Sequence, residues 1–459
     1  MHAQSSLPVW LTPGSARRAL TITAGLVVSV GLACPAWAGD KNDDEELTVS
    51  ATPVPKVDAP PAAVPAAWLA PYTLAAYLQS EYQSHQDSDD QLQQGGSPLN
   101  KERFVLRRAR IRIDGDWKYA HLQMEADGNT TVSPQLRVLH AFGTLKLPQL
   151  WTEKTDADVP IAAVSLGLID TPFGYELMES PRTRFFMERT TQSRAFYPGE
   201  PDLGMKVHGG LYFVRWSIAA MNGEPLDEKS GFAGLSPHSA KDVIFKVGID
   251  THPTKQLQLT GNVSSVRGRG FHSGSDAQKS AVTWRDTNED GQIQPSELTG
   301  QPAIAATPSQ SFTRWAVGAD LQARLQTRLG QSLVYGELTV ASNMDRALYV
   351  ADPVLTGTDV RELGYYVGIV QELTPYGVVG FRYDVYDPNA DFLDKRGGRI
   401  IPQSQSIETF SPLVGVVMPG RARLLFQFDV IKDHFARDPR GVPTDLMNNA
   451  WTLRLQVQL

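Results

Sequence analysis

The sequence predicts an all-β fold, a transmembrane antiparallel β-barrel of about 16 strands with short periplasmic turns and long extracellular loops. Segments of about ten residues alternate apolar and polar side chains, as strands with one lipid-facing and one lumen-facing side do. Short and long connections alternate between these segments. Beyond the N-terminal region, no stretch is apolar enough for a transmembrane helix.

The chain begins with a predicted signal peptide, residues 1–38. Arg17 and Arg18 provide its positive charge, an apolar stretch follows, and a small-residue cleavage pattern places the mature N-terminus near Gly39. The one cysteine, Cys34, lies inside this signal, so the mature chain offers no disulfide and no thiolate metal site. We therefore expect export to the cell outer membrane of a Gram-negative-type bacterium.

Residues 39–71 are acidic at first and then rich in Pro and Ala, which predicts a flexible segment. Within it, Glu46–Thr52 resembles the TonB box of energy-coupled outer-membrane transporters. A disordered tether that matches by chance is the alternative, and no plug-like segment follows.

Residues 72–459 are predicted to form the barrel. Its C-terminal strand shows the pattern most clearly, because Trp451, Leu453 and Leu455 alternate with Thr452 and Arg454. The sixteen predicted strands are 72–83, 103–114, 118–127, 135–147, 161–170, 203–210, 212–222, 242–251, 255–266, 311–324, 330–342, 362–374, 376–386, 404–418, 421–432 and 450–459.

The connections between the predicted strands alternate between short and long. Turns such as Gly115–Asp116 and Pro419–Gly420 are short, whereas 171–202 and 267–310 are long. The connection 148–160 departs from the alternation, because it is long on the short-turn side. A channel of sixteen strands leaves room for water, so the fold predicts passage of small solutes.

Three stretches carry a family resemblance. The first is Gly167–Glu176, with Thr171-Pro172-Phe173-Gly174 at its centre; Phe186–Arg189 and Phe196–Gly204 follow. Together with Phe104–Arg110 and the closing Leu453–Gln456, they resemble the phosphate-selective porin O/P family. The resemblance implies a sixteen-stranded porin, a homotrimer, with residues 171–202 folded into the pore as a constriction loop. Two positions depart from the family pattern: Pro201 stands where arginine is expected, and Leu459 replaces the terminal aromatic residue.

Arginine is the natural ligand for phosphate or carboxylate, because its planar guanidinium donates paired hydrogen bonds. The candidate pore and anion-binding residues are Arg108, Arg110, Arg112, Arg182, Arg184, Arg189 and Arg194. The alternative is that they pair with carboxylates such as Glu176, Glu179 and Glu188. Anion preference and a mixed transverse field both remain open at this point.

The largest loop contains a twelve-residue match to an EF-hand calcium loop, residues 286–297. Oxygen ligands stand at positions one, three and five, a glycine at six, and a glutamate at twelve. Hard oxygen ligands at these spacings predict Ca²⁺ that stiffens an extracellular loop. The candidate metal ligands are Asp286, Asn288, Asp290, Gln292, Gln294 and Glu297.

Enzymatic motifs are weak, and we expect no enzyme. The sequence has no Gly-x-Ser-x-Gly and no His-Glu-x-x-His, while His272, Ser273 and Asp276 are explained by a polar loop tip. The net charge of −7 argues against nucleic acid as a partner. The predicted function is a porin for passive diffusion of small solutes, including anions such as phosphate. The alternative is a barrel whose calcium-ordered surface loops serve adhesion or ligand binding.

Overall fold

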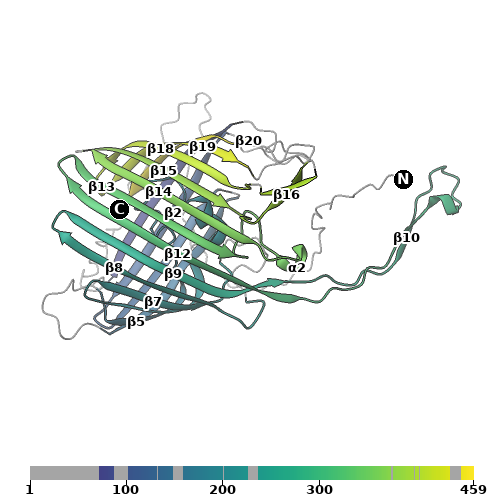
Figure 1. Cartoon of the computed structure of the whole chain (residues 1–459), viewed down its shortest axis with the longest axis horizontal. Coiled ribbons are helices and arrows are strands. Elements are labelled where there is room, and N and C mark those ends of the chain that lie inside the picture. The colour runs from purple at the N-terminus through teal and green to yellow at the C-terminus, as the bar shows by residue number, and fades with distance from the viewer. Residues whose placement is uncertain are drawn as a thin grey trace, which may run out of the picture. The chain divides into compact units, whose positions relative to one another are not determined.

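The computed structural model describes residues 72–86, 102–131, 133–147, 159–199, 201–225, 236–373, 376–396, 398–402, 404–434 and 446–459. The predicted signal peptide, the flexible segment 39–71 and the TonB-box-like stretch lie outside these residues. The described residues from 72 onward form one barrel of tilted strands (Figure 1). Among them, no helix is both long and apolar enough to cross a bilayer.

Sixteen long strands, counted within the described residues, make up the barrel. They are β1 (Tyr72–His85), β2 (Glu102–Asp116), β3 (Ala120–Asn129), β4 (Gln135–Leu147), β5 (Ala162–Asp170), β6 (Pro201–Leu211), β7 (Val214–Met221), β8 (Asp242–Thr254), β9 (Leu257–His272), β12 (Gln310–Thr327), β13 (Gly330–Ser342), β14 (Arg361–Leu373), β15 (Gly377–Asp387), β18 (Ile407–Met418), β19 (Ala422–Asp433) and β21 (Ala450–Gln458). The two-residue β20 (Leu446–Met447) pairs with the end of β19.

The remaining elements lie in the connections. Two small hairpins are β10 (Ala281–Trp284) with β11 (Leu298–Gln301), and β16 (Leu393–Arg396) with β17 (Arg399–Pro402). Three short helices are α1 (Thr191–Phe196), η3 (Pro295–Glu297) and α2 (Pro353–Thr356). None of them contributes a strand to the barrel wall.

The barrel closes because its first and last strands pair. The ladder between β1 and β21 is antiparallel and runs from Tyr77 opposite Gln458 to His85 opposite Ala450. Every neighbouring pair around the ring is antiparallel as well. Closure leaves no open sheet edge, which is what a β-structure in lipid requires. The predicted fold class is therefore confirmed.

The two faces of the wall differ in polarity as the sequence predicts. On β12, Leu321 is 62% exposed on the outer face, whereas its neighbour Asp320 is 6% exposed on the inner face. On β21, Leu455 and Arg454 show the same contrast, with 49% and 1% exposure. A continuous apolar outer surface on so large a sheet marks a membrane-facing wall.

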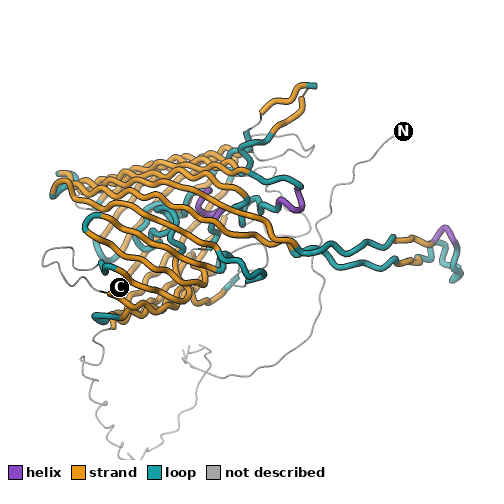
Figure 2. The backbone as a smooth tube through the Cα atoms, turned by 60° about the horizontal axis from the view of Figure 1, so that its bottom comes forward, coloured by secondary structure: helices purple, strands orange, loops and turns teal. Residues whose placement is uncertain are grey.

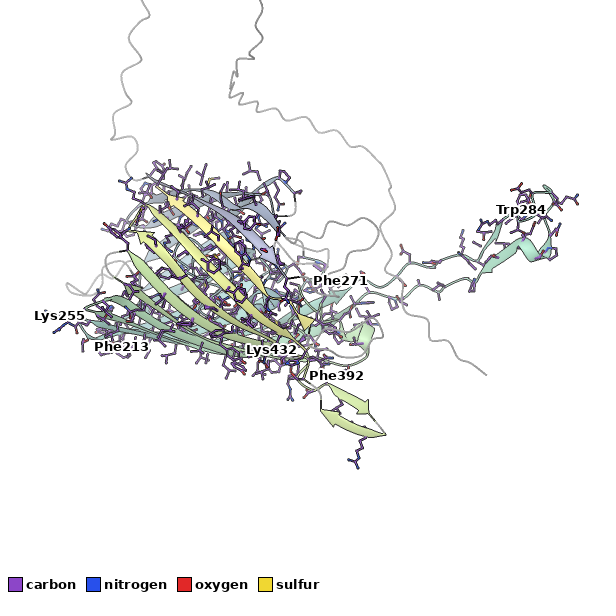
Figure 3. All side chains as sticks on the ribbon, turned by 90° about the horizontal axis from the view of Figure 1, so that it is seen from above. Phe213, Lys255, Phe271, Trp284, Phe392 and Lys432 are labelled. Atoms are coloured by element: carbon purple, nitrogen blue, oxygen red, sulfur yellow. The ribbon has the colours of Figure 1, made fainter. Side chains whose placement is uncertain are left out.

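The two ends of the barrel also differ. Figure 3 labels Phe213 and Lys255, which lie in tight turns at one end, and Phe271 and Lys432, which lie at the other end where the long connections begin. In bacterial outer-membrane barrels in general, short turns face the periplasm and long loops face outward.

Strands β9 and β12 extend beyond their predicted bounds. Their ladder continues to His272 opposite Gln310, so β9 runs six residues past its predicted end and the predicted loop 267–310 begins six residues too early. Bridges at Ser275–Thr307 and Gln278–Ile304, followed by β10 and β11, carry the hairpin further. Backbone pairing therefore orders much of a segment that its polar composition predicts as loop.

Placing a charge on the outer wall tests the membrane-facing assignment. We expect Leu321→Arg to lower the free energy of unfolding by about 2–4 kcal/mol, because a cation near mid-strand would meet hydrocarbon. Leu329→Arg is the matched control: Leu329 is equally exposed, at 61%, but lies in the turn between β12 and β13. Urea titration of barrels folded into phosphatidylcholine vesicles measures both. Equal effects of the two substitutions would contradict the assignment.

Candidate functional site: a loop held inside the barrel

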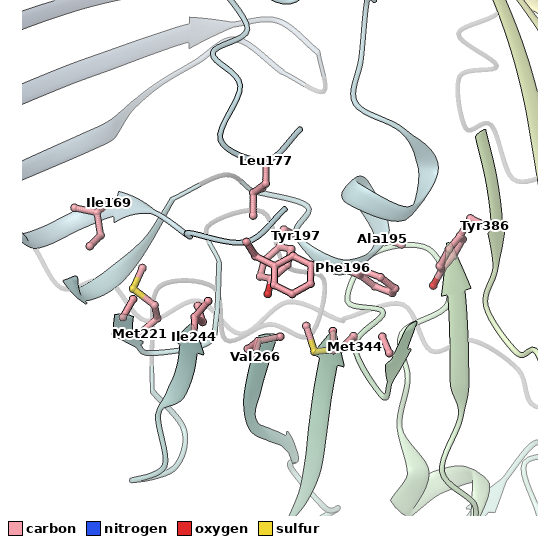
Figure 4. Packing of buried hydrophobic residues seen from close by; sticks show 14 residues of the cluster. Ile169, Leu177, Ala195, Phe196, Tyr197, Met221, Ile244, Val266, Met344 and Tyr386 are labelled. Atoms are coloured by element: carbon pink, nitrogen blue, oxygen red, sulfur yellow. The ribbon is translucent and has the colours of Figure 1, made fainter. Parts of the chain in front are cut away.

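Residues 171–199 leave the end of β5 and fold against the inner wall; we call them the inner loop. Figure 2 shows α1, which belongs to this segment, inside the ring of strands. Its apolar side chains join a buried cluster with inward-facing wall residues, as Phe196 does with Tyr386, their rings 5.6 Å apart (Figure 4). The connection therefore fills part of the lumen and packs like a small core.

Inward-facing glycines let the inner loop approach the wall. At Gly364 on β14, an added Cβ would lie 2.1 Å from the side-chain oxygen of Gln192. At Gly380 on β15, an added Cβ would lie 3.3 Å from the ring of Phe186. Since contacts below 3 Å do not occur between a Cβ and its neighbours, any larger residue at position 364 would push the loop away.

Polar wall side chains hold the backbone of the inner loop. Buried backbone groups need partners, and these come from glutamine amides, arginines and carboxylates on the strands. The bonds are Gln79 Nε2 to Pro181 O (2.9 Å), Gln456 Nε2 to Arg182 O (3.0 Å), Arg382 Nη1 to Glu188 O (2.8 Å), Met187 N to Gln427 Oε1 (2.9 Å), Thr191 N to Asp384 Oδ1 (3.1 Å) and Tyr175 N to Glu337 Oε2 (3.0 Å). They come from strands all along one side of the wall.

Glu188 is the charged centre of this attachment. Its carboxylate accepts from Arg107 Nε at 2.7 Å and Arg108 Nη2 at 3.1 Å, and it lies 3.4 Å from Arg454 Nη2. Arg454 also pairs with Glu81 on β1. Burial raises the pKa of Glu188, but the three guanidinium groups outweigh it and hold that pKa well below the ordinary value.

Arg107 reaches Glu188 because β2 contains a β-bulge. Gln79 pairs with Arg108 and Ser80 with Leu106, so Arg107 is the extra residue and both arginines point inward. Strict alternation places Arg107 on the lipid side, so it is missing from the seven candidate arginines. The sequence does carry a signal: the outward apolar residues change from even positions, such as Phe104, to odd ones after the bulge.

A second buried pair fixes the middle of the inner loop. Glu176, 1% exposed, lies 3.0 Å from Arg382 Nη1 and accepts hydrogen bonds from Thr190 N (2.7 Å) and Thr190 Oγ1 (2.6 Å). Two distant parts of the loop therefore meet on one wall arginine.

The structure separates the seven candidate arginines instead of aligning them. On β2, Arg108 pairs with Glu188 of the inner loop (3.1 Å), while Arg110 and Arg112 pair along the wall with Asp127 (3.1 Å) and Asp114 (2.7 Å). In the inner loop, Arg182 binds Gln458 Oε1 on β21 (3.2 Å). Arg184 and Arg189 bind the loop's own carbonyls, Glu179 O (2.8 Å) and Pro198 O (3.2 Å), and Arg194 on α1 is exposed. The side chain of Arg112 is 44% exposed despite its pair with Asp114.

The calcium candidate, residues 286–297, forms the tip of the β10–β11 hairpin. Gly291 at position six has φ +70°, which permits the sharp turn, and its N–H donates to Asp286 Oδ2 at 2.7 Å. Asp290 Oδ1 accepts from Gln292 N at 2.7 Å, and Asn288 Oδ1 accepts from Asp290 N at 3.1 Å. The first five ligand positions therefore fold around one tight turn, while Gln294 Nε2 donates to Asp290 Oδ2 at 2.7 Å.

Glu297, at position twelve, is turned toward the hairpin. Its Oε1 accepts from Thr287 N at 3.0 Å, and its Oε2 accepts from Trp284 Nε1 at 3.0 Å, which lowers the pKa of Glu297. Within the described ranges, no three Asp, Glu, His or Cys side chains come together as a ligand set. One observation fits a cation: Asp286 Oδ1 is buried and accepts no hydrogen bond from the described part of the chain.

His272 and Ser273, which the sequence places beside Asp276, have different hydrogen-bond partners. His272 Nδ1 lies 2.6 Å from Asp352 Oδ2, and Ser273 Oγ donates to the carbonyl of Gly274. The serine and histidine therefore have separate partners, and no charge relay joins them.

No protein-family model matches the chain. No curated protein matches its sequence. Among solved structures, OprB of Pseudomonas putida at high pH is similar with a TM-score of 0.53 and 11% identity, covering 84% of this chain and 94% of that one. The outer membrane channel DcaP of Acinetobacter baumannii has a TM-score of 0.49 and 10% identity, with 84% of this chain and 97% of that one covered. An anion-selective porin from Comamonas acidovorans has a TM-score of 0.49 and 8% identity, with 84% of this chain and 99% of that one covered. The likeness to OprB supports the closed sixteen-stranded antiparallel barrel as the fold of this chain.

Removing the charge of Glu188 tests the attachment of the inner loop. We expect Glu188→Gln to leave three arginines without their shared carboxylate, so that the loop opens and trypsin cleaves after Arg184 and Arg189 at least several-fold faster. Cleavage after Arg285, on the separate hairpin, is the internal control and should not change.

The same attachment has a defined pH dependence. The pKa of Glu188 is depressed in the folded protein. Its ion pairs therefore stabilise the attached loop fully above the ordinary glutamate pKa, and this stabilisation is lost only as the pH falls toward the depressed pKa. Glu337 is a second carboxylate that binds the inner loop, so Glu337→Gln is the background for this test. Conductance noise of that variant should be alike at pH 7 and pH 5, and loop opening between these values in it would contradict the role of Glu188.

Proposed function

We propose that the protein is an outer-membrane porin, a water-filled channel for passive diffusion of small solutes. The observation that carries this proposal is the inner loop, which narrows a sixteen-stranded lumen from within. A barrel of this size would leave an aqueous path if its lumen were empty, and a loop fixed to one side makes that path narrower and selective. An adhesin would not need a connection anchored by so many inward-facing side chains.

Anion preference is the finer part of the proposal. Most of the candidate arginines are bound to carboxylates or carbonyl groups, so their first role is structural. Arg194 is exposed, and Arg112 is 44% exposed although it pairs with Asp114, so these two are the candidates for a weak anion preference, phosphate included.

The cellular setting follows from the sequence. The predicted signal peptide and the apolar outer wall support insertion into a Gram-negative-type outer membrane, and the family resemblance supports a homotrimer. Cross-linking of the detergent-extracted protein distinguishes a trimer from a monomer. TonB coupling through Glu46–Thr52 stays a weaker proposal, which is tested by solute uptake with and without an energised inner membrane.

Single-channel recording tests the proposed function. We expect stepwise conductance in a planar bilayer, and a roughly twofold fall in the anion-to-cation permeability ratio when both Arg112 and Arg194 are changed to Gln, since two lumen cations are lost. Arg285→Gln, on the hairpin, is the matched control and should have no effect. A folded barrel that never conducts would reject the channel and favour the adhesion alternative.

We propose further that residues 286–297 bind Ca²⁺. Asp286, Asn288 and Asp290 would provide side-chain oxygens, Gln292 its backbone carbonyl, Gln294 a side chain or water, and Glu297 a two-oxygen contact. Glu297 would have to leave Trp284 and Thr287 to do so. The ion would add charge neutralisation and rigidity to the hairpin tip, not catalysis.

Calcium titration tests this site. We expect Ca²⁺ to change tryptophan fluorescence with a dissociation constant in the range of about 10⁻⁴–10⁻³ M, because Trp284 loses its hydrogen bond to Glu297. Glu297→Gln should weaken binding at least tenfold, whereas Glu289→Gln, at the non-ligand position four, should not. A response that is identical in all three proteins would disprove the site.

A further inference from the structure

A cavity lies between the inner loop and the wall on the short-turn side of the barrel. It measures about 560 Å³ and is lined by the first half of the inner loop and by inward residues of β8, β9, β12, β13, β14 and β19. Several of its wall residues, such as Arg324 and Gln331, stand within a few positions of the tight turns. This volume falls in the range of small-molecule sites. None of the seven candidate arginines lines it.

Three cations line this cavity, and one of them has no close partner. Within the described residues, the guanidinium of Arg324 donates no hydrogen bond and forms no ion pair within 4.0 Å. Lys246 Nζ donates to the carbonyl of Gly174 at 2.5 Å, and Arg423 Nη1 donates to the carbonyl of Thr183 at 3.0 Å. Carbonyl partners orient these two groups without removing their charge. The carboxylates that act on them are Asp320 and Glu337 for Lys246, and Glu372 and Glu179 for Arg423.

Two carboxylates lie in the same cavity, but one is already compensated. Glu179 Oε2 lies 3.5 Å from Arg184 Nε, and Glu179 Oε1 accepts from Tyr175 Oη at 2.9 Å. Burial raises the pKa of Glu179, because it disfavours the charged form of this carboxyl, while Arg184 and Arg324 act in the opposite direction. Glu372 is the remaining carboxylate. The lining therefore holds three cations and two carboxylates, a formal excess of one positive charge, while Asp320 and Glu337 act on Lys246 from the neighbouring wall.

Apolar surface lies beside these cations. Met178 and Phe185 from the inner loop and Leu333 from β13 line the same space. The guanidinium of Arg423 lies over the ring of Phe185, 5.0 Å from its centroid, which holds both side chains in place. Met178 is 39% exposed, so a ligand would remove apolar surface from water on binding.

We propose that this cavity is a binding subsite for a small organic anion that has one anionic group and an apolar body. The anionic group lies near Arg324 and Lys246, and the apolar body lies on Met178, Phe185 and Leu333. Inorganic phosphate would use the cations alone and gain nothing from the apolar side. The proposal rests on the proposed channel function, because it names the class of solute that would bind in the channel between the inner loop and the short-turn end.

Two matched pairs of probes test the ligand class. Benzoate has both features, acetate has the charge without the apolar body, and benzamide has the ring without the charge. We expect benzoate to bind the detergent-folded protein, by isothermal titration, at least about tenfold more tightly than acetate or benzamide, since it gains both contacts. Equal binding of benzoate and acetate would overturn the proposal.

Two substitutions of opposite charge then locate the subsite. Arg324→Gln should weaken benzoate binding about tenfold, because it removes a charged hydrogen-bond donor, and Glu372→Gln should strengthen it or leave it unchanged. Near-ultraviolet circular dichroism checks that both variants keep the fold. Unchanged benzoate binding in Arg324→Gln would overturn the proposal.

Bilayer recording separates this subsite from the channel itself. With the wild type, benzoate should reduce the open current at lower concentration from the short-turn side than from the long-loop side. Binding that depends on Arg324 without any conductance would leave the subsite standing and reject the proposed porin function. Conductance without binding that depends on Arg324 would support the porin function and reject the subsite.

Discussion

Closure of the backbone hydrogen-bond ladder is the constraint on which the rest of this structure depends. In hydrocarbon, each unpaired backbone group at a strand edge costs several kcal/mol, so the first and last strands of the sheet have to pair and close the barrel. The register of β1 against β21 achieves this, and it also sets which residues face inward. Arg454 and Gln456 on β21 lie beside Glu81 and Gln79 on β1 because of that register. Gln79, Gln456 and Arg454 bind the inner loop, and Glu81 pairs with Arg454.

The inner loop shows how a polar lumen can be filled without a hydrophobic core of the usual kind. Its backbone is bound by side chains from the wall, and its aromatic rings pack against inward-facing glycines of the strands. Its Glu188 forms ion pairs with three arginines. Such buried charges are costly unless they are paired, which is why the arginine-rich segments are also carboxylate-rich. The charges that were candidates for solute binding serve first to place the loop.

In the channel that we propose, selectivity would come from the cations that have no ion-pair partner. Arg324 on β12 differs from Arg108 on β2 in this respect: the former has no close partner within the described residues, whereas the latter is bound to Glu188 and Gln79. A count of basic residues in the lumen therefore predicts little about the solute. The balance of charge within each cavity, together with the apolar surface beside it, is the informative quantity.

The sequence by itself determined the barrel class, the positions of the strands and the face of nearly every side chain, because a period of two with polar and apolar residues is a local property. It also marked 171–202 as a special connection, through its length and its resemblance to a porin family. Only the tertiary structure decided which charges meet. The bulge that turns Arg107 inward, the convergence of Arg107, Arg108 and Arg454 on Glu188, and the isolation of Arg324 all depend on residues far apart in the chain. Register and closure bring such residues together, and no local pattern encodes the distance between them.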